Sequence, residues 1–134
     1  MILGLTTSKL IWIILALAVV SFLLLQRLTR VPPATAREWL NKGALVIDVR
    51  TEAEFREQHL PGAINIPLDR LGDEITRHAA NKEQPLLLHC RSGARSSRGT
   101  SVLKRMGYQS VFNLGSYGSA ERILKAQSKP GRRN

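Results

Sequence analysis

An uninterrupted apolar run opens the chain and sets its first part apart from everything that follows. Residues 10–25 contain no charged side chain, and Lys9 and Arg27 flank them closely. At about 1.5 Å per residue, such a run spans roughly 24 Å as a helix, which nearly crosses a bilayer core when the flanking cations reach its two surfaces. We therefore expect residues 10–27 to form a transmembrane helix after a short N-terminal flank, residues 1–9.

A cleavable signal peptide is the alternative for this region, because Ala34-Thr35-Ala36 has the small-x-small form of a cleavage site. We disfavour it, since Arg27 and Arg30 stand between the apolar run and this tripeptide. Basic residues are more numerous after the run than before it, and cationic flanks prefer the cytoplasmic side. The sequence thus predicts a single-pass membrane protein whose soluble part faces the cytoplasm.

After the apolar run, short continuous apolar segments alternate with segments of helical spacing. Residues 28–34 are predicted to be a linker, which Val31-Pro32-Pro33 stiffens because proline fixes its own φ. The apolar segments predict strands at residues 44–49, 63–66, 86–90 and 111–114. Predicted helices begin at Thr35, Thr51, Asp69, near Ser96 and at Tyr117, and the first two of these have capping-box sequences.

The alternation of strand and helix predicts the architecture of the soluble part. Strands that are apolar throughout are typical of parallel sheets buried on both faces. We expect an α/β domain over residues 35–127, with helices on both faces of a parallel sheet and active groups at the carboxyl ends of the strands. Residues 128–134 form a basic tail that we expect to be disordered.

Charge and cysteine content narrow the classes of partner. Without Lys9, Arg27 and Arg30 the chain still has 17 basic against 10 acidic residues, a balance of +7. This charge attracts anions of several kinds. Aromatic residues make up only 5% of the chain and do not interleave with a basic stripe, so we expect no nucleic-acid partner. The single cysteine excludes an internal disulfide and a Cys-rich zinc site, and we expect no metal.

The candidate chemistry lies at Cys90, which ends a predicted strand. It is followed by a tight turn of small and basic residues, namely Arg91, Ser92, Gly93, Ala94, Arg95 and Ser96. Backbone amides at a helix N-terminus favour an anion, so we expect Cys90 to have a lowered pKa and to be reactive. Gly93 can supply a backbone conformation denied to residues with a β-carbon, and Arg91 and Arg95 add positive charge. The alternative is a cysteine that acts only as a small buried apolar residue.

Three motifs in order make residues 35–124 resemble the rhodanese family. They are Ile-Asp-Val-Arg at 47–50 with Glu54-Phe55, then His-Leu-Pro-Gly-Ala-Ile-Asn-Ile-Pro at 59–67, then the Cys90 loop. The resemblance implies a double displacement without a cofactor. The Cys90 thiolate takes the outer sulfur of a donor such as thiosulfate, sulfite leaves, and the resulting persulfide passes its sulfur to a nucleophilic acceptor. The resemblance also implies that the loop amides hold the persulfide.

Details of the loop refine this resemblance. Related phosphatases and arsenate reductases have a loop one residue longer between cysteine and arginine, whereas only residues 91–94 separate Cys90 from Arg95. A basic residue directly after the cysteine resembles the members that use thiosulfate. Many members carry Gly-Gly and then tryptophan after the last strand, but residues 114–120 read Leu-Gly-Ser-Tyr-Gly-Ser-Ala. This departure leaves the acceptor open.

Asp48 and Arg50 end the strand beside the predicted site, where they could position the Cys90 loop or bind substrate. We favour a structural ion pair or hydrogen bond for Asp48, and structural roles for His59 and His89. The expected partners are a small anionic sulfur donor, a protein that accepts sulfur, and a membrane. Two other functions remain as hypotheses: a membrane-tethered domain that binds a protein partner without catalysis, and a phosphatase or arsenate reductase.

Overall fold

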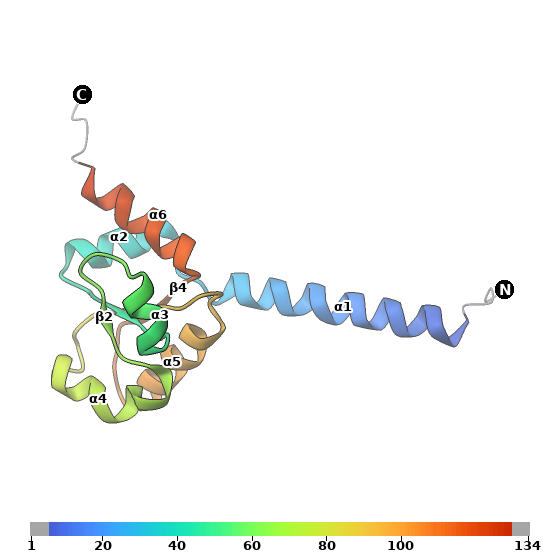
Figure 1. Ribbon diagram of the computed structural model, residues 1–134, viewed down its shortest axis with the longest axis horizontal. Coiled ribbons are helices and arrows are strands. Elements are labelled where there is room, and N and C mark those ends of the chain that lie inside the picture. The colour runs from blue at the N-terminus through green and yellow to red at the C-terminus, as the bar shows by residue number, and fades with distance from the viewer. Residues whose placement is uncertain (1–5, 130–134) are drawn as a thin grey trace.

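The computed structural model describes residues 6–129, and the N-terminal residues 1–5 and most of the predicted basic tail, 130–134, lie outside them. A long helix, α1 (Thr7–Leu28), projects from a domain made of the remaining elements (Figure 1). It is long and apolar enough to cross a membrane, a test that a signal sequence also passes. All of its large apolar side chains are exposed.

The domain has a four-stranded parallel sheet in the order β2-β1-β3-β4, which confirms the predicted α/β fold. The strands are β1 (Leu45–Asp48), β2 (Ile64–Asn65), β3 (Leu86–His89) and β4 (Val111–Gly115). The helices are α2 (Pro33–Asn41), α3 (Glu52–Glu57), the 3₁₀ helix η1 (Leu68–Arg70), α4 (Leu71–His78), α5 (Ala94–Arg105) and α6 (Tyr117–Ser128).

Apolar cores fill both sides of the sheet because side chains alternate between the two faces of a strand. Leu86, Leu88 and Cys90 enter the core on one face, whereas Leu87 enters the core on the other. Figure 1 shows α4 and α5 on one side of the sheet and α2 and α6 on the other. The alternation thereby sends His89, which precedes Cys90, to the opposite face from the sulfur.

The entry into the domain differs from the prediction. The helix α2 begins at Pro33, and Pro32 caps it without a side-chain hydrogen bond, so the predicted capping box at Thr35 is wrong. Proline suits the first helical turn because it lacks the amide hydrogen that would be left unpaired there. The second predicted capping box is confirmed, since Glu54 N–H donates to Thr51 Oγ1 at 3.2 Å and Thr51 N–H donates to Glu54 Oε2 at 3.0 Å.

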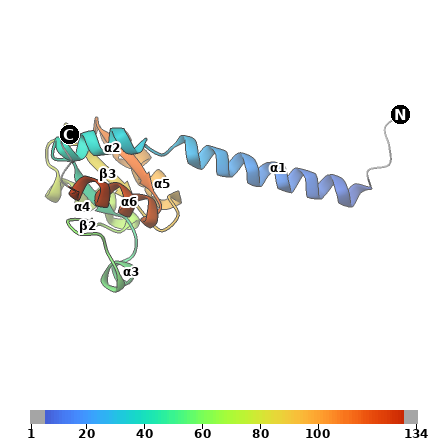
Figure 2. The ribbon, with the colours of Figure 1, turned by 90° about the horizontal axis from the view of Figure 1, so that it is seen from above.

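The predicted linker, residues 28–34, is not a spacer outside the domain. Arg30 pairs with Asn113 as an isolated parallel bridge, and Val31 N–H donates to the Asn113 carbonyl oxygen at 2.9 Å. These residues continue the sheet beyond β4, and Figure 2 shows how short the connection from α1 to α2 is. The end of α1 is therefore held directly against the domain.

Candidate active site

Cys90 follows β3 directly, at the carboxyl end of a strand that lies between β1 and β4. Its N–H donates to the Gly115 carbonyl oxygen at 3.2 Å, which ties it to the end of β4. The side chain of Cys90 is fully buried, and the next two residues, Arg91 and Ser92, are exposed. The predicted nucleophile thus lies just behind a surface turn at the edge of the sheet where parallel α/β folds place their sites.

The turn after Cys90 directs a backbone amide at its sulfur. Gly93 adopts φ +98°, a left-handed conformation that residues with a β-carbon rarely adopt, and it caps α5. In this conformation its N–H donates to Cys90 Sγ at 3.0 Å. The helix α5 begins at Ala94, two residues before the predicted start near Ser96, so its positive N-terminal end lies beside the sulfur.

These donors lower the pKa of the Cys90 thiol. Burial is the largest single influence and acts in the opposite direction, because it disfavours the charged thiolate. Hydrogen bonds from the Ser96 hydroxyl and from the amides of Ser96, Gly93 and Ser92 together outweigh burial, so the pKa lies below its ordinary value. The turn therefore favours a thiolate, the reactive form of cysteine.

Ser96 and Asn113 form a buried polar pair beneath this turn. The Ser96 hydroxyl lies 2.7 Å from Asn113 Oδ1, 3.1 Å from the Gly93 carbonyl oxygen and 3.5 Å from Cys90 Sγ. It has one hydrogen to donate, so these contacts are alternatives and the closest acceptor is Asn113. Asn113 Oδ1 also accepts from Gly115 N–H at 2.8 Å. The amide of Gly93 is therefore the more constant donor to the sulfur.

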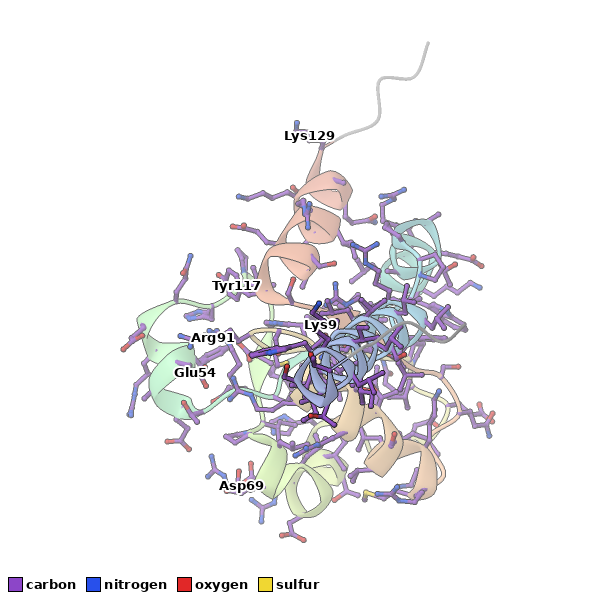
Figure 3. All side chains as sticks on the ribbon, turned by 90° about the vertical axis from the view of Figure 1, so that its right-hand side faces the viewer. Lys9, Glu54, Asp69, Arg91, Tyr117 and Lys129 are labelled. Carbon is purple, nitrogen blue, oxygen red and sulfur yellow. The ribbon has the colours of Figure 1, made fainter. Side chains whose placement is uncertain are left out.

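The two arginines of the turn differ in their pairing. Arg95 donates with both Nη atoms to the two carboxylate oxygens of Glu54, at 2.8 and 2.9 Å. This bidentate pair lowers the pKa of Glu54 to about 2. The Arg91 side chain is 80% exposed, and its Nε lies 3.9 Å from Glu54 Oε1. Figure 3, viewed along α1, shows Arg91 next to Glu54. Glu54 thus neutralises most of the charge of Arg95, and Arg91 is the more exposed of the two arginines.

Asp48 and Arg50 form a buried ion pair at the end of β1. Asp48 accepts from Arg50 N–H, Nε and Nη2 at 2.7–3.0 Å, and Arg50 Nη2 also donates to the Gln58 carbonyl oxygen at 2.6 Å. The Arg50 guanidinium stacks on the Tyr117 ring at 4.9 Å. This arrangement joins β1 to the turn after α3 and to the start of α6, which agrees with the structural role favoured for Asp48.

Comparison with known proteins identifies the fold of the domain. Residues 32–119 match the family described as Rhodanese-like domain. The chain belongs to this family. Among the family members similar to this chain are proteins named as sulfurtransferases. Thiosulfate sulfurtransferase PspE of Escherichia coli is 35% identical over 52% of this chain and 66% of its own length, and GlpE of Stutzerimonas stutzeri is 31% identical over 63% of this chain and 76% of its own length.

Solved structures support the same rhodanese fold. A rhodanese with anions from E. coli aligns with TM-score 0.55 and 32% identity over 57% of this chain and 89% of that chain. The human single-domain sulfurtransferase TSTD1 aligns with TM-score 0.57 and 25% identity over 72% of this chain and 96% of that chain. In this rhodanese domain, the predicted site residues from Cys90 to Ser96 form one continuous turn and helix start.

Three residues around the rhodanese loop were not among the predicted site residues. Glu54 belongs to a motif used for the resemblance, but its partner Arg95 is distant in sequence. Asn113 is a polar residue within an apolar strand, which is a signal of a buried hydrogen-bonding role. Arg30 donates from Nη2 to the Ser92 carbonyl oxygen at 3.0 Å. No local pattern predicts that contact.

Proposed function

We propose that the protein is a sulfurtransferase that carries a sulfane sulfur as a persulfide on Cys90. The observation that carries the proposal is the Gly93 N–H, which is directed at Cys90 Sγ from the N-terminal end of α5. A preorganised donor of this kind stabilises negative charge on sulfur without reorganisation during the reaction. The names of the relatives PspE and GlpE support sulfur transfer from thiosulfate.

In the proposed reaction, the Cys90 thiolate attacks the outer sulfur of thiosulfate or a similar donor. A bond forms between Cys90 Sγ and this sulfur, and the sulfur–sulfur bond of thiosulfate breaks with its electron pair leaving on sulfite. The persulfide keeps the negative charge on its outer sulfur. A nucleophilic acceptor then attacks that sulfur, and the electron pair of the Cys90 persulfide bond returns to Sγ as a thiolate.

The charges around the turn fit an anionic donor. Arg91 is exposed and only loosely paired, so it can attract a doubly charged anion towards the turn. Arg95 is held by Glu54, which makes it a fixed support for the start of α5. Cys90 is fully buried and Arg91 and Ser92 are the exposed residues that follow it, so the donor approaches the sulfur from the side of these two residues.

We further propose that α1 crosses a membrane once and that the domain lies on the cytoplasmic side. Its large apolar side chains are all exposed, which is costly in water and favourable in lipid. Arg27 and Arg30 follow the apolar run on the side of the domain. Reporter fusions to the C-terminus test the orientation: a fluorescent cytoplasmic reporter should be active, and an active periplasmic-type phosphatase reporter would reverse it.

The test of the sulfurtransferase proposal is the intact mass of the full-length protein after incubation with thiosulfate. We expect a gain of one sulfur atom, with one sulfite released for each sulfur bound. Because Cys90 is the single cysteine, Cys90→Ser should abolish the gain. Ser101→Ala is a matched control, since Ser101 is an exposed residue of α5 away from the turn. Sulfur that stays bound to Cys90→Ser refutes the proposal.

The complete burial of Cys90 favours a second candidate, a rhodanese-like domain that binds a protein partner without catalysis. In that case wild-type protein takes up no sulfur, and Cys90→Ser keeps its cellular function. A phosphatase or arsenate reductase is disfavoured, because only residues 91–94 separate Cys90 from Arg95 and the single cysteine leaves no second thiol for reductive recycling. Turnover of a phosphotyrosine analogue without sulfur uptake would favour it over both.

A further inference from the structure

Arg30 connects the end of α1 to the Cys90 turn. It lies two residues after the last residue of α1, Leu28, and its backbone pairs with Asn113 beside β4. The same Asn113 holds the turn from below, because its Nδ2 lies 3.3 Å from the Gly93 carbonyl oxygen. The start of the domain and the turn after β3 are therefore both held by Asn113, in the middle of β4.

Two glycines leave the space that the Arg30 side chain occupies. A β-carbon on Gly115 would lie 2.8 Å from both Cδ and Nε of Arg30, which is too close for any real contact. A β-carbon on Gly93 would lie 3.4 Å from Arg30 Nη2. The side chain thus lies flat across the backbone of the turn. Its Nε is buried and has no hydrogen-bond partner within residues 6–129, so the guanidinium depends on its contact with the Ser92 carbonyl oxygen.

Arg30 contacts the peptide between Ser92 and Gly93, and the N–H of this same peptide donates to the Cys90 sulfur. Arg30 Nη2 donates to the carbonyl oxygen of Ser92 at 3.0 Å, and the N–H of the next residue, Gly93, donates to Cys90 Sγ at 3.0 Å. In a planar trans peptide the carbonyl oxygen and the amide hydrogen point in opposite directions. Fixing the oxygen on one side therefore fixes the hydrogen on the other.

We propose that Arg30 is a positioning residue that locks the Ser92–Gly93 peptide with its N–H directed at Cys90 Sγ. Only the expected effect on sulfur transfer rests on the proposed function; the effect on the Cys90 thiolate does not. A glycine can adopt backbone conformations on either side of φ 0°, so the peptide before Gly93 can rotate when Arg30 no longer holds its oxygen and the isolated bridge between Ser92 and Ser116 is the restraint that remains on Ser92. Rotation turns the Ser92 carbonyl oxygen towards the sulfur, where its partial negative charge opposes a thiolate or a persulfide.

The test compares full-length Arg30→Met, which removes the donor but keeps most of the length, with Arg30→Lys, which retains a donor and the charge. Arg27→Met is the matched control, since Arg27 is an exposed cation at the end of α1. The readout is the rate of Cys90 alkylation by a small reagent as a function of pH, which requires no sulfur transfer. Thermal unfolding of each variant monitors the fold.

We expect Arg30→Met to move the midpoint of the alkylation profile up by about one pH unit, a tenfold loss of thiolate near neutral pH. Arg30→Lys should lie between this variant and wild type, and Arg27→Met should match wild type. The rate constant of sulfur loading at saturating thiosulfate should fall with the thiolate fraction, and KM should change little.

Three results overturn the inference: an unchanged midpoint in Arg30→Met, an equal shift in Arg27→Met, or a raised KM with an unchanged midpoint, which makes Arg30 a donor-binding residue instead. If Arg30→Met does not fold, Arg30→Lys carries the same comparison, and a midpoint equal to that of Arg27→Met counts against the inference. If wild type takes up no sulfur, the proposed function fails, and the alkylation profiles still decide the role of Arg30.

Discussion

The close contact between Gly115 and Arg30 can be tested by the cost of a single methyl group. Gly115 has φ +88°, and a β-carbon there would lie 2.8 Å from Arg30 Cδ and Nε. Gly43 has a similar φ of +82°, but no heavy atom lies within 4 Å of its β-carbon position. Gly43→Ala therefore measures the conformational cost alone, and Gly115→Ala measures that cost together with the displacement of Arg30.

The expected magnitudes follow from these two environments. A left-handed conformation costs a non-glycine residue about 1–2 kcal/mol, which is the expected loss in Gly43→Ala. Forcing an extra carbon into a filled site costs about 1–3 kcal/mol more, so Gly115→Ala should lose roughly 2–5 kcal/mol of unfolding free energy. In an Arg30→Ala background the obstructing atoms are gone. There, Gly115→Ala and Gly43→Ala should cost the same.

Urea unfolding of the full-length protein in detergent micelles, followed by circular dichroism, provides the free energies for this double-mutant cycle. Wild type, both glycine variants, Arg30→Ala and the two double variants are measured under one set of conditions. The reasoning is wrong if Gly115→Ala and Gly43→Ala cost the same in the wild-type background. It is also wrong if the excess cost of Gly115→Ala persists when Arg30 is alanine.

Three further predictions concern buried and paired side chains. Burial lowers the pKa of His89 below 6.5, so below about pH 6.5 the unfolded chain binds a proton that the folded chain does not. The free energy of unfolding should therefore fall as the pH drops below about 6.5. In urea titrations at several pH values, His89→Leu should reduce this pH dependence. Tyr108→Phe removes a hydrogen bond to the buried Ala79 carbonyl oxygen and should cost about 1–3 kcal/mol in the same assay. The ionised Glu54 stabilises the fold fully above pH 4.5, and this stability is lost as the pH falls through about 2. In an acid titration, Glu54→Gln should lack this pH-dependent loss of stability. An acid titration of Glu54→Gln that matches wild type would contradict the role of the Arg95 pair.

Local patterns predicted the elements of this fold, because each element depends on residues close in sequence. The apolar run at 86–90 predicted β3 and placed Cys90 at its carboxyl end, and the capping box at Thr51 predicted the start of α3. The start of α5 was harder to predict. It depends on the left-handed conformation of Gly93, because of which the helix begins at Ala94. A glycine in a turn can adopt a left-handed conformation, but the sequence alone does not show whether it does so or where the helix after it begins.

The contacts around the site were harder to predict because they join distant parts of the chain. The charge of Arg95 depends on Glu54 in α3, and nothing near Arg95 in sequence indicates that partner. Arg30 lies in a segment whose prolines predicted only a stiff connector. Its contact with Ser92 is possible because Gly115 and Gly93 have no β-carbon, which leaves room for the Arg30 side chain. Such a contact requires the topology before it can be recognised.

The position of Arg30 leads to a last prediction that separates the contact from the length of the connection to α1. A Gly-Gly insertion between Leu28 and Thr29 lengthens the connection but leaves Arg30 next to Val31, whose N–H pairs with Asn113. The same insertion between Arg30 and Val31 leaves the Val31 hydrogen bond in place and moves Arg30 away from the Ser92 carbonyl oxygen.

We expect the first insertion to preserve the alkylation profile of Cys90 and the second to reproduce the shift of Arg30→Met, because only the second removes the donor from the Ser92–Gly93 peptide. Both insertions add the same two residues, so each is the control for the other. Equal profiles in the two variants would mean that the distance between α1 and the domain, rather than the hydrogen bond from Arg30, sets the reactivity of Cys90.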